Sequence, residues 1–111
     1  MFQPGLFKGH RILVTGGGTG LGRAMAERLL ELGAEIVICG RRGRVLDAAA
    51  AEMTARHGGG VSTHVVDIRD AAAVDAMIET IWKGGKLTGL INNAAGNFVS
   101  RTQDLSPRGF D

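Results

Sequence analysis

The chain has 111 residues, a formal net charge of +2 and 44% hydrophobic residues. This composition supports a hydrophobic core and excludes a disordered chain, and its charges form no long basic block of the kind that binds nucleic acid. No apolar segment is long enough for a membrane span and no signal peptide is evident, so we expect a cytoplasmic protein without a membrane partner. The single cysteine, Cys39, excludes an internal disulfide and fits a reducing compartment.

The first predicted strand and helix lie near the N-terminus. The apolar run at positions 12–14 predicts a buried parallel strand, and a helix ending near the C-cap candidate Gly33 follows. The apolar residues at helical spacing are Leu21, Met25, Leu29 and Leu32. Of these, Met25 is expected to face the core.

A glycine-rich turn joins this strand to this helix. Such a turn leaves backbone N–H groups unpaired at the positive end of the helix dipole, which suits a phosphate or pyrophosphate. Gly16 lets the chain turn out of the strand, Gly20 lets a pyrophosphate approach the backbone, and Gly22 lets the helix pack closely on the sheet.

A P-loop is the main alternative for this turn. Gly17 and Gly22 have the spacing of that motif. However, Arg23 and Ala24 stand where a P-loop requires Lys and then Ser or Thr, so phosphoryl transfer is not indicated.

The rest of the chain predicts alternating strands and helices. The strands are expected at 35–39, 61–66 and 87–93, and the helices at 43–57 and between the N-cap Asp70 and the stop at Gly84. Another helix is expected to begin at Ser106-Pro107. Parallel strands joined by helical crossovers give an α/β fold, a Rossmann-type doubly wound parallel sheet with the order β-α-β-α-β-α-β.

Candidate site residues follow the strands of this sheet. They are Gly16–Gly22, Arg41, Asp67 and Asn92–Gly96. The carboxyl ends of parallel strands lie at one edge, where doubly wound sheets bind ligands. We therefore expect these residues to converge on one site.

Two motifs at strand ends resemble those of the short-chain dehydrogenase/reductase family. They are Thr-Gly-Gly-Gly-Thr-Gly-Leu-Gly at 15–22 and Asn-Asn-Ala-Ala-Gly at 92–96, with Asp67 after the third strand. Within the family, Asn92–Phe98 followed by Leu105-Ser106-Pro107 resembles the 2,4-dienoyl-CoA reductase branch, parts of which related enoyl-CoA reductases and alcohol dehydrogenases share. The resemblance implies a Rossmann-type fold over nearly the whole chain.

The resemblance further implies a nicotinamide dinucleotide at the carboxyl edge. Asp67 would accept a hydrogen bond from the adenine amino group while the N–H of Ile68 meets a ring nitrogen, and Asn92 and Asn93 would fasten the loop beside the nicotinamide. The alternative for Asp67 is an aspartate that simply precedes a helix, and the alternative for Asn92 and Asn93 is an ordinary turn at the end of a strand. The implied cofactor-binding residues are Gly16, Gly18, Thr19, Gly20, Leu21, Gly22, Arg41, Arg42, Asp67, Ile68, Asn93, Ala94, Ala95 and Gly96.

The choice of cofactor depends on the residues after the second strand. NAD enzymes place Asp or Glu there to hold the ribose 2′-hydroxyl, whereas this chain has Gly40-Arg41-Arg42. A carboxylate repels a 2′-phosphate and a guanidinium pairs with it. The sequence therefore predicts NADP(H), with Arg41 the better candidate and Arg42 the second, and a solvated basic turn is the alternative.

The likeness to the dienoyl-CoA branch implies a small-molecule substrate, an acyl-CoA. Its contacts would be Arg69, Phe98 and Ser106. An arginine suits the CoA phosphates and an aromatic ring can cover the apolar chain of a thioester, whereas core packing for Phe98 and helix capping for Ser106 are the alternatives. The three histidines lack metal-ligand spacing, so no metal site is expected.

The chain contains no tyrosine. The family transfers a hydride at the nicotinamide with a tyrosine and a nearby lysine handling the proton, so no catalytic residue is assigned. We expect positions 1–111 to be the N-terminal cofactor-binding half of a longer enzyme, inactive alone and with an exposed fourth-strand edge that favours aggregation. By family resemblance the full-length form is expected to be a homo-oligomer, a tetramer.

The leading functional hypothesis is NADP(H)-dependent reduction of a 2,4-dienoyl-CoA or enoyl-CoA by the full-length form. A carbonyl or alcohol oxidoreductase of the same family is one alternative. A non-catalytic dinucleotide-binding module is the other. A Tyr-x-x-x-Lys motif or a dienoyl-type Tyr and Asn pair beyond Asp111 would decide between enzyme and module.

Overall fold

Strand β1 (Arg11–Thr15) lies inside a parallel sheet, between β2 (Glu35–Gly40) and β4 (Gly89–Asn92). Strand β3 (Val61–Val65) pairs with the other side of β2, so the strand order is β3-β2-β1-β4. The computed structural model describes residues 5–93. Strands β1 and β2 are apolar at most positions because helices cover both of their faces.

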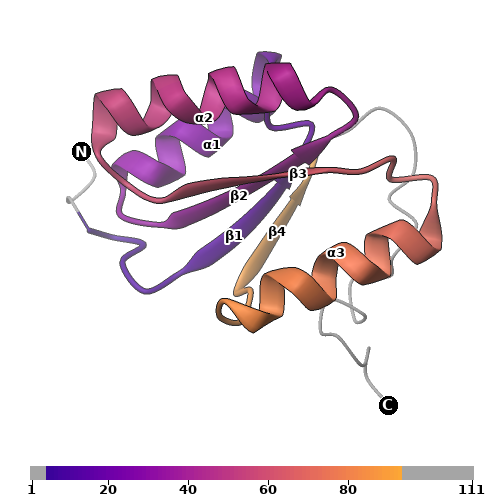
Figure 1. Cartoon of the computed structure of the whole chain (residues 1–111). Helices are drawn as coiled ribbons and strands as arrows, with labels where there is room; N and C mark the ends of the chain where they lie inside the picture. Colours follow the sequence, from indigo (N-terminus) through magenta and orange to yellow (C-terminus); the bar gives the residue numbers. More distant parts are fainter. Residues whose placement is uncertain (1–4, 94–111) are drawn as a thin grey trace.

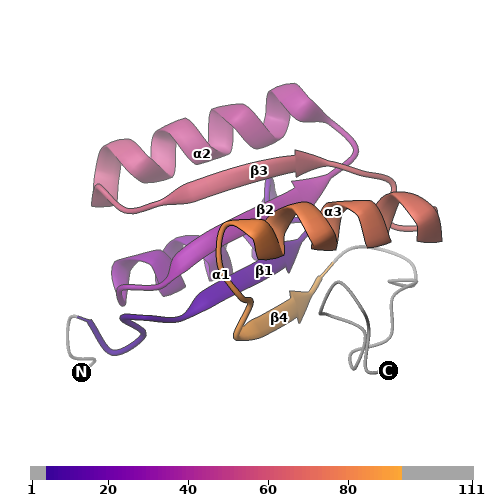
Figure 2. The ribbon, with the colours of Figure 1, turned by 60° about the horizontal axis from the view of Figure 1, so that its bottom comes forward.

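Three helices cover the two faces of the sheet. Helices α1 (Gly20–Glu31) and α2 (Gly43–His57) lie on one face and α3 (Ala71–Lys83) lies on the other (Figure 1). With the molecule turned, α3 stands in front of the sheet and α1 behind it (Figure 2). This alternation confirms the predicted α/β fold, a Rossmann-type doubly wound sheet. None of the helices within residues 5–93 combines the length and apolarity that a membrane crossing needs.

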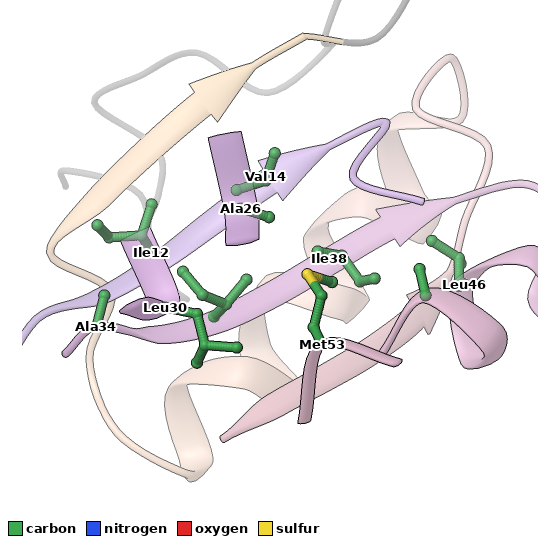
Figure 3. Packing of buried hydrophobic residues seen from close by; sticks show 10 residues of the cluster. Ile12, Val14, Ala26, Leu30, Ala34, Ile38, Leu46 and Met53 are labelled. Carbon is green, nitrogen blue, oxygen red and sulfur yellow. The ribbon is translucent and has the colours of Figure 1, made fainter. Parts of the chain in front are cut away.

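Each face of the sheet has its own hydrophobic core, because successive residues of a strand point to opposite sides. The core under α1 and α2 contains Ile12, Val14, Ile36 and Ile38 of the sheet and Ala26, Leu30, Leu46 and Met53 of the helices (Figure 3). The core under α3 contains Leu13, Val37, Cys39, Val74, Met77, Ile78 and Ile81. Full burial of one large aliphatic side chain contributes about 1.5–3 kcal/mol. A slip of β1 by one residue would exchange the two sets, so packing fixes its register.

The inner face of α1 differs from the predicted one. Its buried residues are Gly22, Ala26 and Leu30, whereas Leu21 is 68% exposed and Met25 is half-buried. The small residues face inward because α1 starts directly against the glycine turn. A Cβ atom at Gly22 would overlap the carbonyl oxygen of Gly16. Close approach, and not side-chain size, therefore sets the rotation of this helix.

The element bounds agree closely with the prediction, and α2 covers the predicted 43–57. The fourth strand is shorter than the predicted 87–93. Its pairing with β1 begins at Gly89, opposite Ile12. It ends at Asn92, because the next backbone N–H, at Asn93, donates to the Thr15 side chain instead of to a backbone carbonyl.

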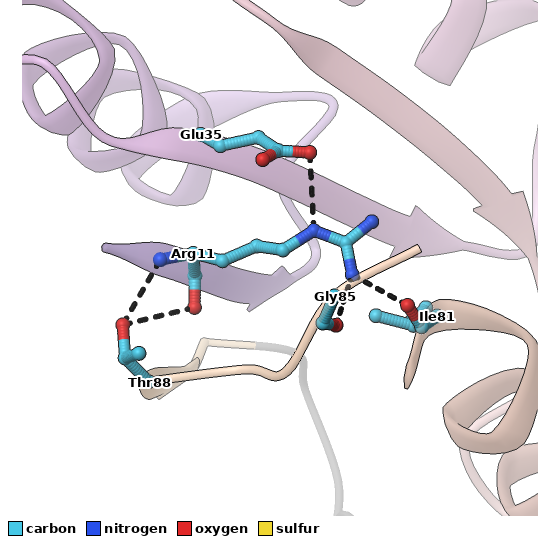
Figure 4. A network of polar contacts seen from close by, with 5 residues as sticks. All are labelled: Arg11, Glu35, Ile81, Gly85 and Thr88. Carbon is cyan, nitrogen blue, oxygen red and sulfur yellow. Dashed lines mark hydrogen bonds and ion pairs between the residues drawn. The ribbon is translucent and has the colours of Figure 1, made fainter. Parts of the chain in front are cut away.

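Arg11 joins three elements at the amino edge of the sheet (Figure 4). Its Nε atom lies 3.1 Å from Glu35 Oε2 on β2, and Nη1 donates to the carbonyl oxygens of Ile81, in the last turn of α3, and of Gly85, just after the helix. The Arg11 side chain is only 13% exposed. A cation is favourable here because the last carbonyls of a helix carry partial negative charge. This network therefore ties the end of α3 to β1 on the side away from the predicted site.

Candidate functional site

An open hollow lies at the carboxyl edge of the sheet. Its volume is about 670 Å³, within the range typical of ligand pockets. The lining residues are Gly16, Thr19, Gly40, Arg41, Arg42, Val66, Asp67, Ile68 and Arg69. They come from the ends of β1, β2 and β3, so the structure brings seven predicted site residues together: Gly16, Thr19, Arg41, Arg42, Asp67, Ile68 and Arg69. Gly18 lines a smaller hollow beside it, and Gly20 and Gly22 are not among the lining residues.

The glycine turn forms one wall of this hollow. Gly16 and Gly20 have positive φ angles of 66° and 58°, which residues with a side chain rarely adopt. Apart from the neighbours of Gly20 and the backbone of its own helix, no atom of the described residues lies within 4 Å of the position that a Cβ of Gly20 would take. The Gly16 N–H donates to the carbonyl oxygen of Cys39 over 2.9 Å, which fixes the turn to β2. The backbone is thus exposed where a flat or anionic group could approach it.

The helices that begin beside the hollow differ from α3 in their capping. The N-cap residues of α1 and α2, Thr19 and Arg42, make no side-chain capping bond, and neither first turn contains an acid. By contrast, Asp70 Oδ1 accepts the N–H of Ala73 over 3.1 Å at the start of α3. The first N–H groups of α1 and α2 therefore offer positive potential to a bound anion.

Asp67 and Arg69, which also line the hollow, form a close pair. Arg69 Nε lies 3.0 Å from Asp67 Oδ1, Nη2 lies 3.0 Å from Oδ2, and the backbone N–H of Arg69 also donates to Oδ1. These hydrogen bonds from Arg69, with a smaller contribution from the charge of Arg41, lower the pKa of Asp67 to about 2. Sequence reasoning assigned Asp67 and Arg69 to two different ligands and missed their contact. Their spacing of two residues was the available signal, since an aspartate commonly accepts the N–H two residues on.

Thr15 connects the glycine turn to the end of β4. Its side chain is fully buried, and Oγ1 accepts the N–H of Asn93 over 2.9 Å and donates to Asn92 Oδ1 over 3.0 Å. The side-chain nitrogen of Asn93 also borders Gly22. The sequence contained this signal as a polar residue that ends an otherwise apolar strand. Asn93 is therefore brought to the start of α1.

Other predicted residues lie away from the hollow or outside the described part. Leu21 is exposed at the start of α1 and does not line the hollow. Ala94, Ala95, Gly96, Phe98 and Ser106 lie outside residues 5–93. Burial raises the pKa of the Cys39 thiol to about 12, which makes it inert. In the part of the chain that the structure describes, no group of three or more His, Cys, Asp or Glu side chains could hold a metal ion.

Comparisons with known proteins agree with this geometry. The chain is 41% identical over 112 residues to the Caenorhabditis elegans protein named "probable 2,4-dienoyl-CoA reductase", an alignment that covers 99% of this chain and 36% of that protein. Among solved structures, the citronellol catabolism dehydrogenase AtuB of Pseudomonas aeruginosa PAO1 is 43% identical with a TM-score of 0.83, over 87% of this chain and 41% of that one. The L-sorbose reductase of Gluconobacter frateurii, solved with NADPH and L-sorbose, is 30% identical with a TM-score of 0.77, over 90% of this chain and 38% of that one.

These matches concern only part of each relative. The chain spans about a third of the length of the curated relatives it matches. The family model described as short chain dehydrogenase matches residues 10–111, nearly the entire chain. With 2,4-dienoyl-CoA reductases among its relatives and a doubly wound sheet whose first strand ends in the predicted glycine motif, the chain belongs to the short-chain dehydrogenase/reductase family.

Proposed function

We propose that residues 1–111 form the nucleotide-binding part of an NADP(H)-dependent oxidoreductase. The observation that carries this proposal is the placement of Arg41 and Arg42, which follow β2 and line the same hollow as the glycine turn and Asp67. An NAD enzyme has a carboxylate at this place to hold the ribose 2′-hydroxyl. Two guanidinium groups instead favour a 2′-phosphate, with which they form charge-assisted hydrogen bonds.

The residues of the hollow fit the rest of such a cofactor. The N–H groups at the start of α1 and the open side of Gly20 suit a pyrophosphate. Asp67 and the N–H of Ile68 would receive the adenine, and Asn93, held by Thr15, would position the loop on the nicotinamide side with Ala94, Ala95 and Gly96. When bound, the nicotinamide supplies the hydride. This chain's residues bind and orient it.

For the substrate we propose a 2,4-dienoyl-CoA or enoyl-CoA. The support is the name of the C. elegans relative, together with Arg69 on the rim of the hollow and the residues Phe98 and Ser106. A carbonyl or alcohol substrate is the second candidate, because the relative solved with NADPH also holds L-sorbose. The proton-handling tyrosine is proposed to lie outside positions 1–111, which contain none. We further propose a cytoplasmic homo-oligomer for the whole protein, and inactivity for positions 1–111 alone.

Calorimetric titration with NADPH and NADH tests the cofactor proposal. We expect NADPH to bind at least about tenfold more tightly, as one charge-assisted contact provides. Arg41→Gln should abolish most of this preference. Arg44→Gln is the matched control, because Arg44 belongs to the same basic run but is exposed on α2 and does not line the hollow. Equal affinity for the two cofactors, or a preference that survives Arg41→Gln and Arg42→Gln together, would contradict the proposal.

A further inference from the structure

We propose that Asp67 is a positioning residue that holds Arg69 as a preset fork for a phosphate monoester on an adenosine ribose. The Asp67 carboxylate would then bind the adenine directly and orient Arg69 for the phosphate of an adenine nucleotide. This inference rests on the proposed function, because it requires an adenine nucleotide in the hollow. It goes further by assigning Asp67 a second task and Arg69 a fixed orientation.

The pair is held at three points. Two side-chain N–H groups of Arg69, on Nε and Nη2, meet the two carboxylate oxygens side by side, each over 3.0 Å. The backbone N–H of Arg69 binds Oδ1 over the same distance. A guanidinium bound along one edge by a planar carboxylate cannot rotate freely. Arg69 is thus oriented before any ligand arrives, although its side chain is 69% exposed.

Both partners retain binding capacity. None of the hydrogen bonds that Arg69 makes within residues 5–93 uses Nη1, so no described residue binds along the outer edge formed by Nη1 and Nη2. That edge has the fork geometry that matches a phosphate. On the other partner, Oδ2 accepts only Nη2 among the contacts of the described residues, which leaves a lone pair for an adenine amino group. The pair can therefore meet both groups at once without breaking.

The position of the pair indicates the ligand class. Arg41, Arg42 and Arg69 line one hollow with Asp67, so three cations accompany one carboxylate among the described residues that line it. A phosphate monoester carries more negative charge at neutral pH than a phosphodiester and suits such a surface. NADPH carries one on its adenosine ribose at the 2′ position, and CoA carries one at the 3′ position. The chemistry at Arg69 is the same for both.

A purely electrostatic argument and the positioning role of Asp67 predict opposite effects of neutralising Asp67 on phosphate binding, and this difference provides the test. Asp67 is an anion, so its neutralisation should strengthen the binding of any phosphate if charge alone mattered. If Asp67 positions Arg69, its neutralisation should weaken phosphate recognition. The size expected for losing the orientation of one exposed guanidinium is roughly fivefold.

The experiment compares affinity ratios in the whole protein. Calorimetry gives the dissociation constants of NADPH and NADH and of CoA and 3′-dephospho-CoA for wild type, Asp67→Asn, Arg69→Gln, the double variant and the control Arg44→Gln. Within each ligand pair the adenine is common, so its loss of binding cancels in the ratio. Asp67→Asn should lower the preference for the phosphorylated member of one pair by roughly fivefold, and this effect should vanish in the Arg69→Gln background. The pair whose ratio responds identifies the source of the phosphate.

The outcomes separate the inference from the proposed function. Unchanged or increased phosphate preference in Asp67→Asn, with NADPH still preferred by wild type, would overturn the inference alone. The same holds if Arg69→Gln changes neither ratio. Failure of wild type to bind either dinucleotide would overturn both. Circular dichroism melts of each variant verify that the protein is folded at the titration temperature.

Discussion

The hydroxyl of Thr15 lies 2.9 Å from the backbone nitrogen of Asn93, although the two residues are far apart in sequence. Through this contact the end of β1, where the glycine turn begins, is joined to the end of β4, where the second motif begins. The Asn93 side chain in turn borders Gly22 at the start of α1. Asn93 of the second motif is therefore held against the glycine turn of the first motif.

The Thr15 hydroxyl is expected to stabilise the protein measurably. In Thr15→Val the shape is kept, but the N–H of Asn93 and the Asn92 side chain lose their buried partner, which should cost about 1–3 kcal/mol of unfolding free energy. Thr15→Ser retains the hydroxyl and should cost only about 0.8 kcal/mol for the lost methyl group. Urea denaturation measures both. Equal losses in the two variants would show that the hydroxyl contributes nothing.

Two glycines of the turn should respond differently to alanine. In Gly22→Ala the new methyl group meets the backbone at Gly16, which cannot move aside easily, so unfolding free energy should fall by about 1–3 kcal/mol. In Gly20→Ala the space is open and the positive φ angle of 58° costs about 1–2 kcal/mol at most.

Alanine at Gly20 and alanine at Gly22 should also have different effects on nucleotide binding. Gly20→Ala places a methyl group on the face proposed for the pyrophosphate, and we expect it to weaken NADPH binding by about tenfold or more. Residual binding by folded Gly22→Ala should be reduced less. The reverse order of effects would contradict the assignment of the two glycines.

Arg11 should stabilise the fold mainly through the end of α3. Arg11→Gln removes the bonds to the carbonyl oxygens of Ile81 and Gly85 as well as the pair with Glu35, and should cost about 1.5–3 kcal/mol. Glu35→Gln removes only the ion pair, whose acid is 52% exposed, and should cost less than about 1 kcal/mol. Thermal melts compare the two. Nucleotide affinity should be unchanged in both, because Arg11 lies at the amino edge.

Asp67 should titrate at unusually low pH. Its pKa of about 2 in the folded protein lies below the value of about 3.9 for an unperturbed aspartate. Because the folded-state pKa is the lower one, the pair with Arg69 contributes fully above about pH 4 and loses its contribution as the pH falls through 2. Carboxyl-carbon NMR should place the midpoint of Asp67 near 2. In Arg69→Gln we expect the midpoint of Asp67 to rise toward 3.9, and in Arg41→Gln we expect it to rise by a smaller amount. A wild-type midpoint near 3.9 would contradict the pairing.

The sequence determined the order and type of the elements, because this information is local. Apolar runs bounded by glycines specify the strands, and the N-cap at Asp70 and the helical spacing of Val74, Met77 and Ile78 specify α3. The same patterns located Arg41 and Asp67 after strands, and parallel pairing then required them to share an edge.

Tertiary structure decided what depends on close approach between distant segments. The rotation of α1, which buries Ala26 and leaves Leu21 exposed, follows from the contact between Gly22 and Gly16, whereas the spacing of the large apolar residues predicts a different inner face. The Thr15–Asn93 contact likewise joins residues far apart in sequence and requires positions that only the assembled sheet fixes, whereas the Asp67–Arg69 pair is a local contact that the spacing of two residues could have indicated. Hydrophobic periodicity reports which side of an element is buried on average, whereas a hydrogen bond or a steric limit depends on distances of a few tenths of an ångström, which packing alone sets.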